Sequence, residues 1–146
     1  MYNTLLEDIK SAMKTKDSEK LSVLRLLYAN IKNSLIDNSS KQVDDKFFYN
    51  ILSKYIKELE ENIENYSKLG RVDLVDKEEY ELKVLKNYLP TQLTDEEIYS
   101  LVKSEVDKIS DFSIKNMGEV INNISKEYEY RVTSKKISEI IRSKFL

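Results

Sequence analysis

Two residue types that carry much of enzyme chemistry are missing from this chain, which has neither cysteine nor histidine. Their absence excludes thiol nucleophiles, disulfides, zinc sites built on imidazole or thiolate, and catalytic triads with an imidazole base. Glycine occurs twice and proline once. Because β-sandwiches and barrels need many such residues at their corners, this scarcity predicts an all-α fold of long helices.

The remaining composition is typical of a folded protein with a heavily solvated surface. Hydrophobic residues make up 40% of the 146 and charged residues 34%, as amphipathic helices around a small core require. No stretch approaches the roughly 20 apolar residues of a membrane span. The N-terminal sequence MYNTLLEDIKSAMK has acids where a secretory signal has an apolar run. We therefore expect a cytoplasmic protein without membrane contact.

The first part of the chain shows start signals for two helices. Thr4 and Glu7 have the spacing of a capping box. The apolar face behind it would consist of Leu6, Ile9 and Met13. Asp17 is suited to cap a second helix, which runs to about Ile36 with apolar residues at every third or fourth position. The polar stretch 37–42 is expected to be a loop.

A long apolar stripe predicts a third helix, and a shorter pattern predicts a fourth at about 72–88. The third helix should begin after Asp44 or Asp45 and end at Gly70, which suits a C-terminal cap. Its stripe consists of Phe48, Leu52, Tyr55, Leu59, Ile63 and Tyr66. We interpret the stripe as one wall of an intramolecular bundle, with a coiled-coil seam as the alternative.

The end of one helix and the beginning of the next are predicted close together, near the single proline. Pro90 forbids a continuing helix, and Thr94 with Glu97 forms a second capping box. We therefore expect an N-terminal helical domain of about four helices at 1–90 and a C-terminal domain at 94–146. Joints near 110–113 and 128–133 divide the latter into a small three-helix bundle.

The glycines and the acidic residues are interpreted as structural. Gly70 and Gly118 are solitary, so a helix cap and a close helix crossing, respectively, are favoured over a phosphate-binding loop. The acidic run at 58–64 is interpreted as solvated surface paired with neighbouring lysines rather than as a metal site. We therefore expect no metal, no cofactor and no catalytic residue in this chain alone.

Five strings spread over essentially the whole chain form a recognisable set: KLSVLRLL from Lys20, ANIKN from Ala29, RVDLVDKEEYEL from Arg71, YLPTQLT from Tyr88 and KNMGEV from Lys115. Together they resemble the GatB/YqeY family. The Tyr-Leu-Pro-x-Gln-Leu pattern is the most specific of them. The resemblance implies a two-domain helical protein whose C-terminal domain is similar to the tail domain of the GatB subunit of glutamine-dependent tRNA amidotransferase, which contacts tRNA. It also implies the family label of carbon–nitrogen ligase with glutamine as amide donor.

The candidate nucleic-acid-binding residues lie in the C-terminal domain. From Arg131 to Leu146 the only acid is Glu139, so the last helix is basic. Its cations either offset the helix macrodipole on a solvated face or neutralise phosphates. Two tyrosines before it either stack on exposed bases or are half-buried bundle residues. The candidate site comprises Lys115, Arg131, Lys135, Lys136, Arg142, Lys144, Tyr128 and Tyr130.

Three departures from the family pattern fall near this site. The turn at 127–133 lacks the basic, glycine-containing sequence usual in the family. Glu119 stands where lysine is common, and Asn122 stands where a second small residue is usual. Each departure removes positive charge or backbone freedom from the part of the domain expected to approach RNA.

Three functional hypotheses follow from the residues and the resemblance. The first is binding of tRNA through the C-terminal domain. The second is a protein-interaction adaptor, in which the N-terminal helices with exposed tyrosines such as Tyr49 and Tyr80 dock an amidotransferase or aminoacyl-tRNA synthetase subunit. The third, a genuine amidotransferase, ranks last because no nucleophile with a paired base can be identified.

Overall fold

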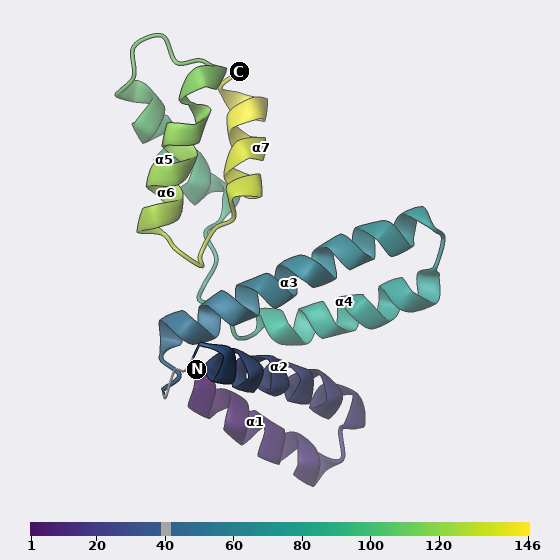
Figure 1. Cartoon of the computed structure of the whole chain (residues 1–146). Coiled ribbons are helices and arrows are strands. Elements are labelled where there is room, and N and C mark those ends of the chain that lie inside the picture. The colour runs from purple at the N-terminus through teal and green to yellow at the C-terminus, as the bar shows by residue number, and fades with distance from the viewer. Residues whose placement is uncertain (39–41) are drawn as a thin grey trace. The chain divides into compact units, whose positions relative to one another are not determined.

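The computed structural model describes residues 1–38 and 42–146, which form helices joined by short turns (Figure 1). In chain order these are α1 (Tyr2–Thr15), α2 (Ser18–Asp37), α3 (Asp45–Lys68), α4 (Val72–Lys86), α5 (Asp95–Asp107), the short 3-10 helix η1 (Ile114–Asn116), α6 (Met117–Glu127) and α7 (Ser134–Lys144). These described ranges contain no β-strand, so the predicted all-α class is confirmed.

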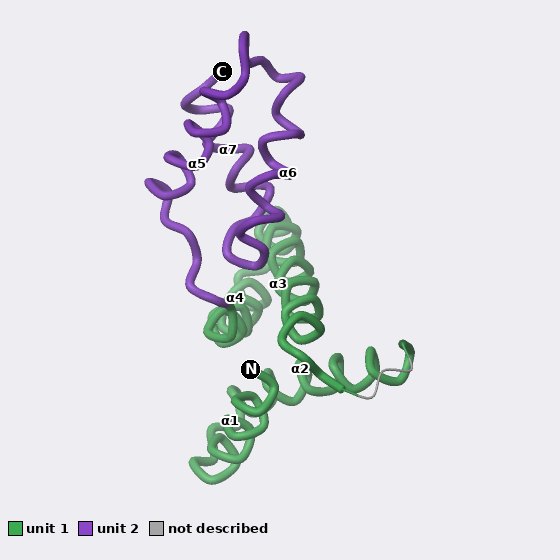
Figure 2. The backbone as a smooth tube through the Cα atoms, turned by 90° about the vertical axis from the view of Figure 1, so that its left-hand side faces the viewer, with its two compact units in different colours: residues 1–89 green, residues 90–146 purple. Residues whose placement is uncertain are grey.

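The chain divides into two compact units, at Met1–Leu89 and Pro90–Leu146 (Figure 2). Each unit has a hydrophobic core of its own. Among the described residues, no helix combines the length and the apolar character that crossing a membrane requires.

The first unit is built from two helical hairpins (Figure 1). Helix α1 packs against α2, α3 runs beside α4, and α2 contacts both helices of the second hairpin. The core between them consists of Leu5, Ala12, Val23, Leu24, Leu27, Ile31, Phe48, Leu52, Ile56, Leu59, Val84, Leu85 and Tyr88. The stripe of α3 thus forms a wall of this intramolecular core, as the sequence predicted.

Local start signals predicted two of the first three helix starts. The side chain of Asp17 accepts a hydrogen bond from the Lys20 amide at 3.3 Å, and that of Asp44 accepts one from the Phe47 amide at 2.8 Å. The capping box at Thr4 was wrong, because α1 already begins at Tyr2. Of the expected loop at 37–42, residues 39–41 lie outside the described part of the chain.

The inward face of α1 also differs from the prediction. Leu6 and Ile9 are half-buried, but the fully covered positions are Leu5 and Ala12. Met13 is 52% exposed, so its predicted core position was wrong. The buried face of α1 therefore runs through positions 5 and 12, which are seven residues, or two turns, apart.

The second unit is a three-helix bundle formed by α5, α6 and α7, which all contact one another. The predicted capping box opens α5: the Glu97 amide donates to Thr94 Oγ1 at 3.2 Å, and the Thr94 amide donates to Glu97 Oε1 at 3.3 Å. The core residues of the unit are Leu93, Ile98, Val102, Met117, Val120, Ile124, Ile137 and Ile141.

The two glycines have different surroundings. Gly70 adopts a left-handed conformation with φ of 69° directly after α3, as predicted for a helix end. Gly118 lies exposed in the first turn of α6, and outside its own helix no described atom lies within 4 Å of where a Cβ would stand. The predicted close helix crossing at Gly118 was therefore wrong, because no neighbouring element approaches it.

Lys16 makes a turn that normally calls for glycine. It follows α1 with φ of 56°, and the amides of Lys16 and Asp17 donate to carbonyls of the last helical turn. We expect Lys16→Gly to stabilise the first unit by roughly 0.5–1 kcal/mol, because glycine adopts this conformation without a Cβ clash. The matched variant Lys14→Gly, inside α1, should destabilise it by about 1 kcal/mol. Urea unfolding followed by circular dichroism measures both; equal effects would contradict the strain argument.

A buried tyrosine joins the end of the α3–α4 hairpin to α1. Tyr88, 4% exposed, donates its hydroxyl hydrogen to Asp8 Oδ2 and packs edge-on against the ring of Phe48. Burial raises the pKa of Tyr88 above its usual value of 10, and the hydrogen bond and the negative charge of Asp8 raise it further. At pH values somewhat above 10, the hydroxyl therefore stays protonated in the folded chain, whereas the unfolded chain has lost the proton.

This raised pKa predicts alkaline sensitivity. The stability that Tyr88 contributes is complete below pH 10 and is lost as pH rises further, because the unfolded chain releases the proton first. At pH 8, the Tyr88→Phe variant should unfold at a lower urea concentration than the unsubstituted protein. Its free energy of unfolding should be lower by about 1–2 kcal/mol. By pH 11 the gap to the unsubstituted protein should narrow by about 1.4 kcal/mol. A gap that stays constant from pH 8 to 11 would contradict the raised pKa of Tyr88.

Candidate nucleic-acid interface

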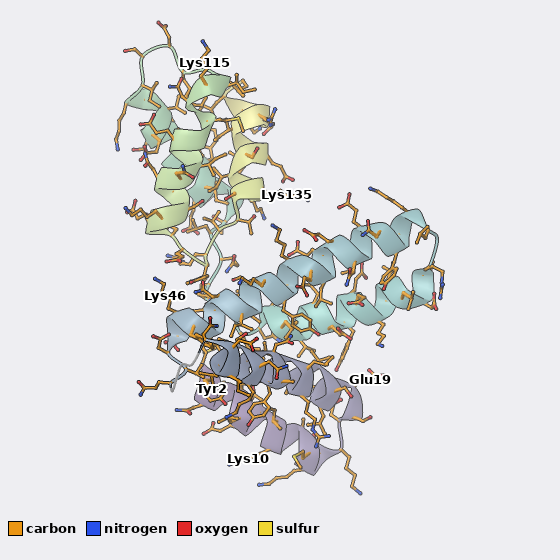
Figure 3. All side chains as sticks on the ribbon, in the orientation of Figure 1. Tyr2, Lys10, Glu19, Lys46, Lys115 and Lys135 are labelled. Atoms are coloured by element: carbon orange, nitrogen blue, oxygen red, sulfur yellow. The ribbon has the colours of Figure 1, made fainter. Side chains whose placement is uncertain are left out.

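The predicted site residues do not form one continuous surface. Lys115 in η1 and Lys135 in the first turn of α7 lie at opposite ends of the second unit (Figure 3). Arg142 and Lys144 occupy the last turn of α7, about 10 Å along its axis from Lys135. The candidate cations are therefore divided between the two ends of α7.

A set of hydrogen bonds occupies part of the predicted site. The Gln92 side chain donates to the Tyr130 carbonyl at 2.8 Å, and the Leu93 amide donates to the Arg131 carbonyl at 2.9 Å. In the opposite direction, Arg131 Nε donates to the Thr91 carbonyl at 2.8 Å. We call these three bonds the Gln92–Arg131 clamp. They fasten the extended segment before α5 to the turn between α6 and α7, which closes the bundle at one end.

The guanidinium of Arg131 also covers an aromatic ring. Its Cζ lies 5.8 Å from the centre of the Tyr128 ring, within cation–π range. Tyr128 packs against the core of the second unit and is half-buried. Arg131 and Tyr128 are thus engaged with each other, which is the structural alternative that the sequence left open for Tyr128.

A shallow hollow lies beside Tyr128, and its polar edge is acidic. The hollow, of about 330 Å³, is lined by Leu93, Glu96, Glu97, Ser100, Leu101 and Tyr128. Two carboxylates at this edge repel phosphate groups. The accessible part of Tyr128 therefore faces a surface that is poorly suited to RNA.

The turn that lacks the family's glycine still adopts a glycine-like conformation. Tyr130 has φ of 67°, in the left-handed region that bulky residues rarely occupy. Its carbonyl is the one that receives the Gln92 side chain. The turn therefore contains a strained residue, Tyr130.

The remaining cations are exposed. Lys136 Nζ lies 3.4 Å from Asp95, joining the starts of α7 and α5, and the lysine side chain stays 52% exposed. In the ranges 1–38 and 42–146, Lys115, Lys135, Arg142 and Lys144 take part in no ion pair. These four cations are the part of the predicted site that is free to meet a polyanion.

Sequence reasoning missed an aromatic pair at the far end of α7. Tyr99 of α5 stacks on Phe145, with ring centres 5.2 Å apart and planes inclined by 28°. Tyr99 remains 39% exposed. The stacking of the two rings left no signal in the sequence. The sequence does show that Lys103 follows Tyr99 by one helical turn, so that a cation and an aromatic ring share a helix face.

Titratable groups also meet between α3 and α4 in the first unit. Tyr55 donates its hydroxyl hydrogen to Glu81 Oε2 at 3.4 Å, and burial, with this carboxylate, raises the pKa of Tyr55. Burial, followed by the charge of Glu81, raises the pKa of Glu78. Among the described residues, no three acidic side chains converge closely enough to hold a metal ion. The group has the character of a buried structural contact.

Tyr49 and Tyr80, predicted to be exposed, are half-buried against the core of the first unit. Both fall on the helix faces that close the core, so the prediction of exposed docking tyrosines was wrong. The large apolar side chains that do remain exposed in this unit are Met13, Leu26, Ile36, Leu69 and Val72.

The clamp predicts unequal roles for two arginines. Arg131→Gln should destabilise the second unit by about 1–2 kcal/mol, because it removes the bond to Thr91 and the contact with the Tyr128 ring. The matched variant Arg142→Gln removes the same charge from an exposed site and should change stability by less than about 0.5 kcal/mol. Denaturant unfolding of both variants provides the test; equal stability would return Arg131 to the set of free cations.

Comparison with known proteins places the chain in a family. Residues 2–145 match the family model described as YqeY-like protein. The protein named "Altered inheritance of mitochondria protein 41, mitochondrial" from Pyrenophora tritici-repentis is 32% identical over 148 positions, covering 96% of this chain and 80% of that protein. Its namesakes from Lachancea thermotolerans and Eremothecium gossypii are 39% identical over 85 residues, which is 58% of this chain and 46% of each relative. The matches to these two relatives span about half of the length of each. Because the family model matches residues 2–145, the chain belongs to the family of YqeY-like proteins.

Proposed function

We propose that this YqeY-like protein binds RNA through its C-terminal unit. The RNA in this proposal is tRNA, and the process is the amidation of aminoacyl-tRNA. The observation that carries the proposal is the charge of α7, where Lys135, Lys136, Arg142 and Lys144 accompany a single acid, Glu139. All four cations are exposed. Exposed lysine and arginine neutralise phosphates and release the counterions held by the nucleic acid, which supplies most of the affinity of such contacts.

The contact residues in this proposal are fewer than the sequence predicted. Arg131 and Tyr128 are assigned to the fold, because the clamp and the ring contact engage them. Lys136 stays among the contacts, since an exposed ion pair such as that with Asp95 is worth less than about 1 kcal/mol and opens readily. Lys135, Arg142 and Lys144 are the principal phosphate contacts, and Lys115 lies at the end of the unit opposite Lys135 (Figure 3).

A protein-interaction adaptor is the second candidate. Its supporting observation is the acid-edged hollow beside Tyr128, whose apolar floor and carboxylates suit a basic protein segment better than RNA. A subunit of an amidotransferase or of an aminoacyl-tRNA synthetase is the partner in this candidate. Affinity purification after nuclease treatment separates the two: stable protein partners without RNA favour the adaptor.

Catalysis of carbon–nitrogen bond formation is kept as a third candidate on the family resemblance alone. It requires glutaminase activity from the purified protein, and release of glutamate from glutamine measures it directly. A cytoplasmic location, predicted from the composition, also stays a prediction. The relatives carry "mitochondrial" in their names, so fractionation of the source cells decides the compartment.

The main proposal is tested by reversing charge on α7. The double variant Lys135→Glu with Lys136→Glu should retain tRNA on a filter at least about tenfold less well at low salt. The slope of log affinity against log salt should fall by about one unit per phosphate contact removed. Lys10→Glu with Lys14→Glu, which makes the same charge change on exposed positions of α1, is the matched control. Equal retention by the two double variants would reject this site.

A further inference from the structure

The stacked pair of Tyr99 and Phe145 forms a flat apolar surface at the end of α7. Stacking holds the two rings together across α5 and the residue after α7. Phe145 packs against the core of the unit and so provides a fixed base, while Tyr99 is 39% exposed. Part of an aromatic ring is therefore held open to the surroundings in a fixed orientation.

Three cations flank this aromatic surface. Lys103 follows Tyr99 by one turn of α5 and shares a helix face with it, and Arg142 stands in the last turn of α7, three residues before Phe145. Lys144 is adjacent to Phe145 in the chain. All three are exposed, and within the described part of the chain none of them forms an ion pair. The acids nearest in register are Asp95, Glu96 and Asp107 on α5 and Glu139 on α7, and Asp95 is paired with Lys136.

We infer that the Tyr99–Phe145 pair is a platform for an unpaired nucleotide base, with Lys103, Arg142 and Lys144 contacting the adjoining phosphates. Base stacking on an aromatic side chain combined with cations along the backbone is the general means by which proteins hold single-stranded nucleic acid. The inference rests on the proposed RNA binding and deepens it, because it specifies which part of an RNA is held.

The chemistry favours unpaired nucleotides over a duplex. In a double helix both faces of each base are covered by neighbouring pairs, so an exposed protein ring finds no partner there. A loop, bulge or single-stranded end presents free base faces. The hollow beside Tyr128 has two carboxylates and no cation among its lining residues, and so the nucleotide is assigned to the Tyr99 surface, where Lys103, Arg142 and Lys144 are exposed.

The experiment uses the full chain and a 12-nucleotide uridine-rich RNA carrying one 2-aminopurine, alongside a duplex of equal length. Stacking on Tyr99 should change the 2-aminopurine fluorescence, and the single strand should bind at least several-fold more tightly than the duplex. Tyr99→Leu should weaken binding of the single strand about tenfold or more, the loss expected for one stacked base. Tyr99→Phe keeps the ring and should bind as the unsubstituted protein does.

Each outcome separates this inference from the proposed function. Unchanged binding by Tyr99→Leu, or a preference for the duplex, overturns the platform and leaves the tRNA proposal to the charge-reversal test on α7. Absence of both tRNA and single-strand binding by the unsubstituted protein overturns both. Thermal unfolding of the Tyr99 variants provides the folding check. Arg142→Glu, at an exposed position outside the core, should reduce binding of the single strand independently of any change at Tyr99.

Discussion

The second unit depends on three hydrogen bonds that link the segment before α5 to the turn before α7. The Gln92–Arg131 clamp gives the Thr91 carbonyl and the Leu93 amide their partners in the turn before α7, while the Pro90 carbonyl accepts from the Gln92 side chain within the segment. Two of the three bonds of the clamp use side chains, those of Gln92 and Arg131. The most specific string of the family resemblance, which contains Gln92, therefore has a structural explanation in this unit.

The fold was predictable wherever the signal was local. Asp17, Asp44 and Thr94 cap helices because their side chains satisfy amides three residues further on, and Gly70 ends a helix through its own backbone freedom. Errors arose where a distant element decides. The apolar spacing in α1 did not show that Ala12 rather than Met13 faces the core, and nothing in the sequence around Gly118 shows that its helix face is left open.

The candidate site was predictable in composition but not in use. The sequence identified the basic residues of α7, and all four are exposed. It did not show that Arg131 reaches back 40 residues to the Thr91 carbonyl, because tertiary hydrogen bonds leave no periodic pattern. It also passed over Tyr99, whose relevance comes from a ring 46 positions later in the chain. Neighbouring helices of this unit thus differ in charge: α5 has an acidic first turn, and α7 is basic.

Backbone strain at Tyr130 lowers the free-energy cost of opening the Gln92–Arg131 clamp. Its left-handed backbone stores strain of the order of 1 kcal/mol, while its carbonyl holds the side chain of Gln92. Release of that strain partly offsets the loss of the hydrogen bond whenever the turn opens. The segment at 90–93 therefore detaches, with the three helices still packed, more often than it would if residue 130 were a glycine. Amide protons of this segment consequently exchange with solvent sooner than those of the helical core.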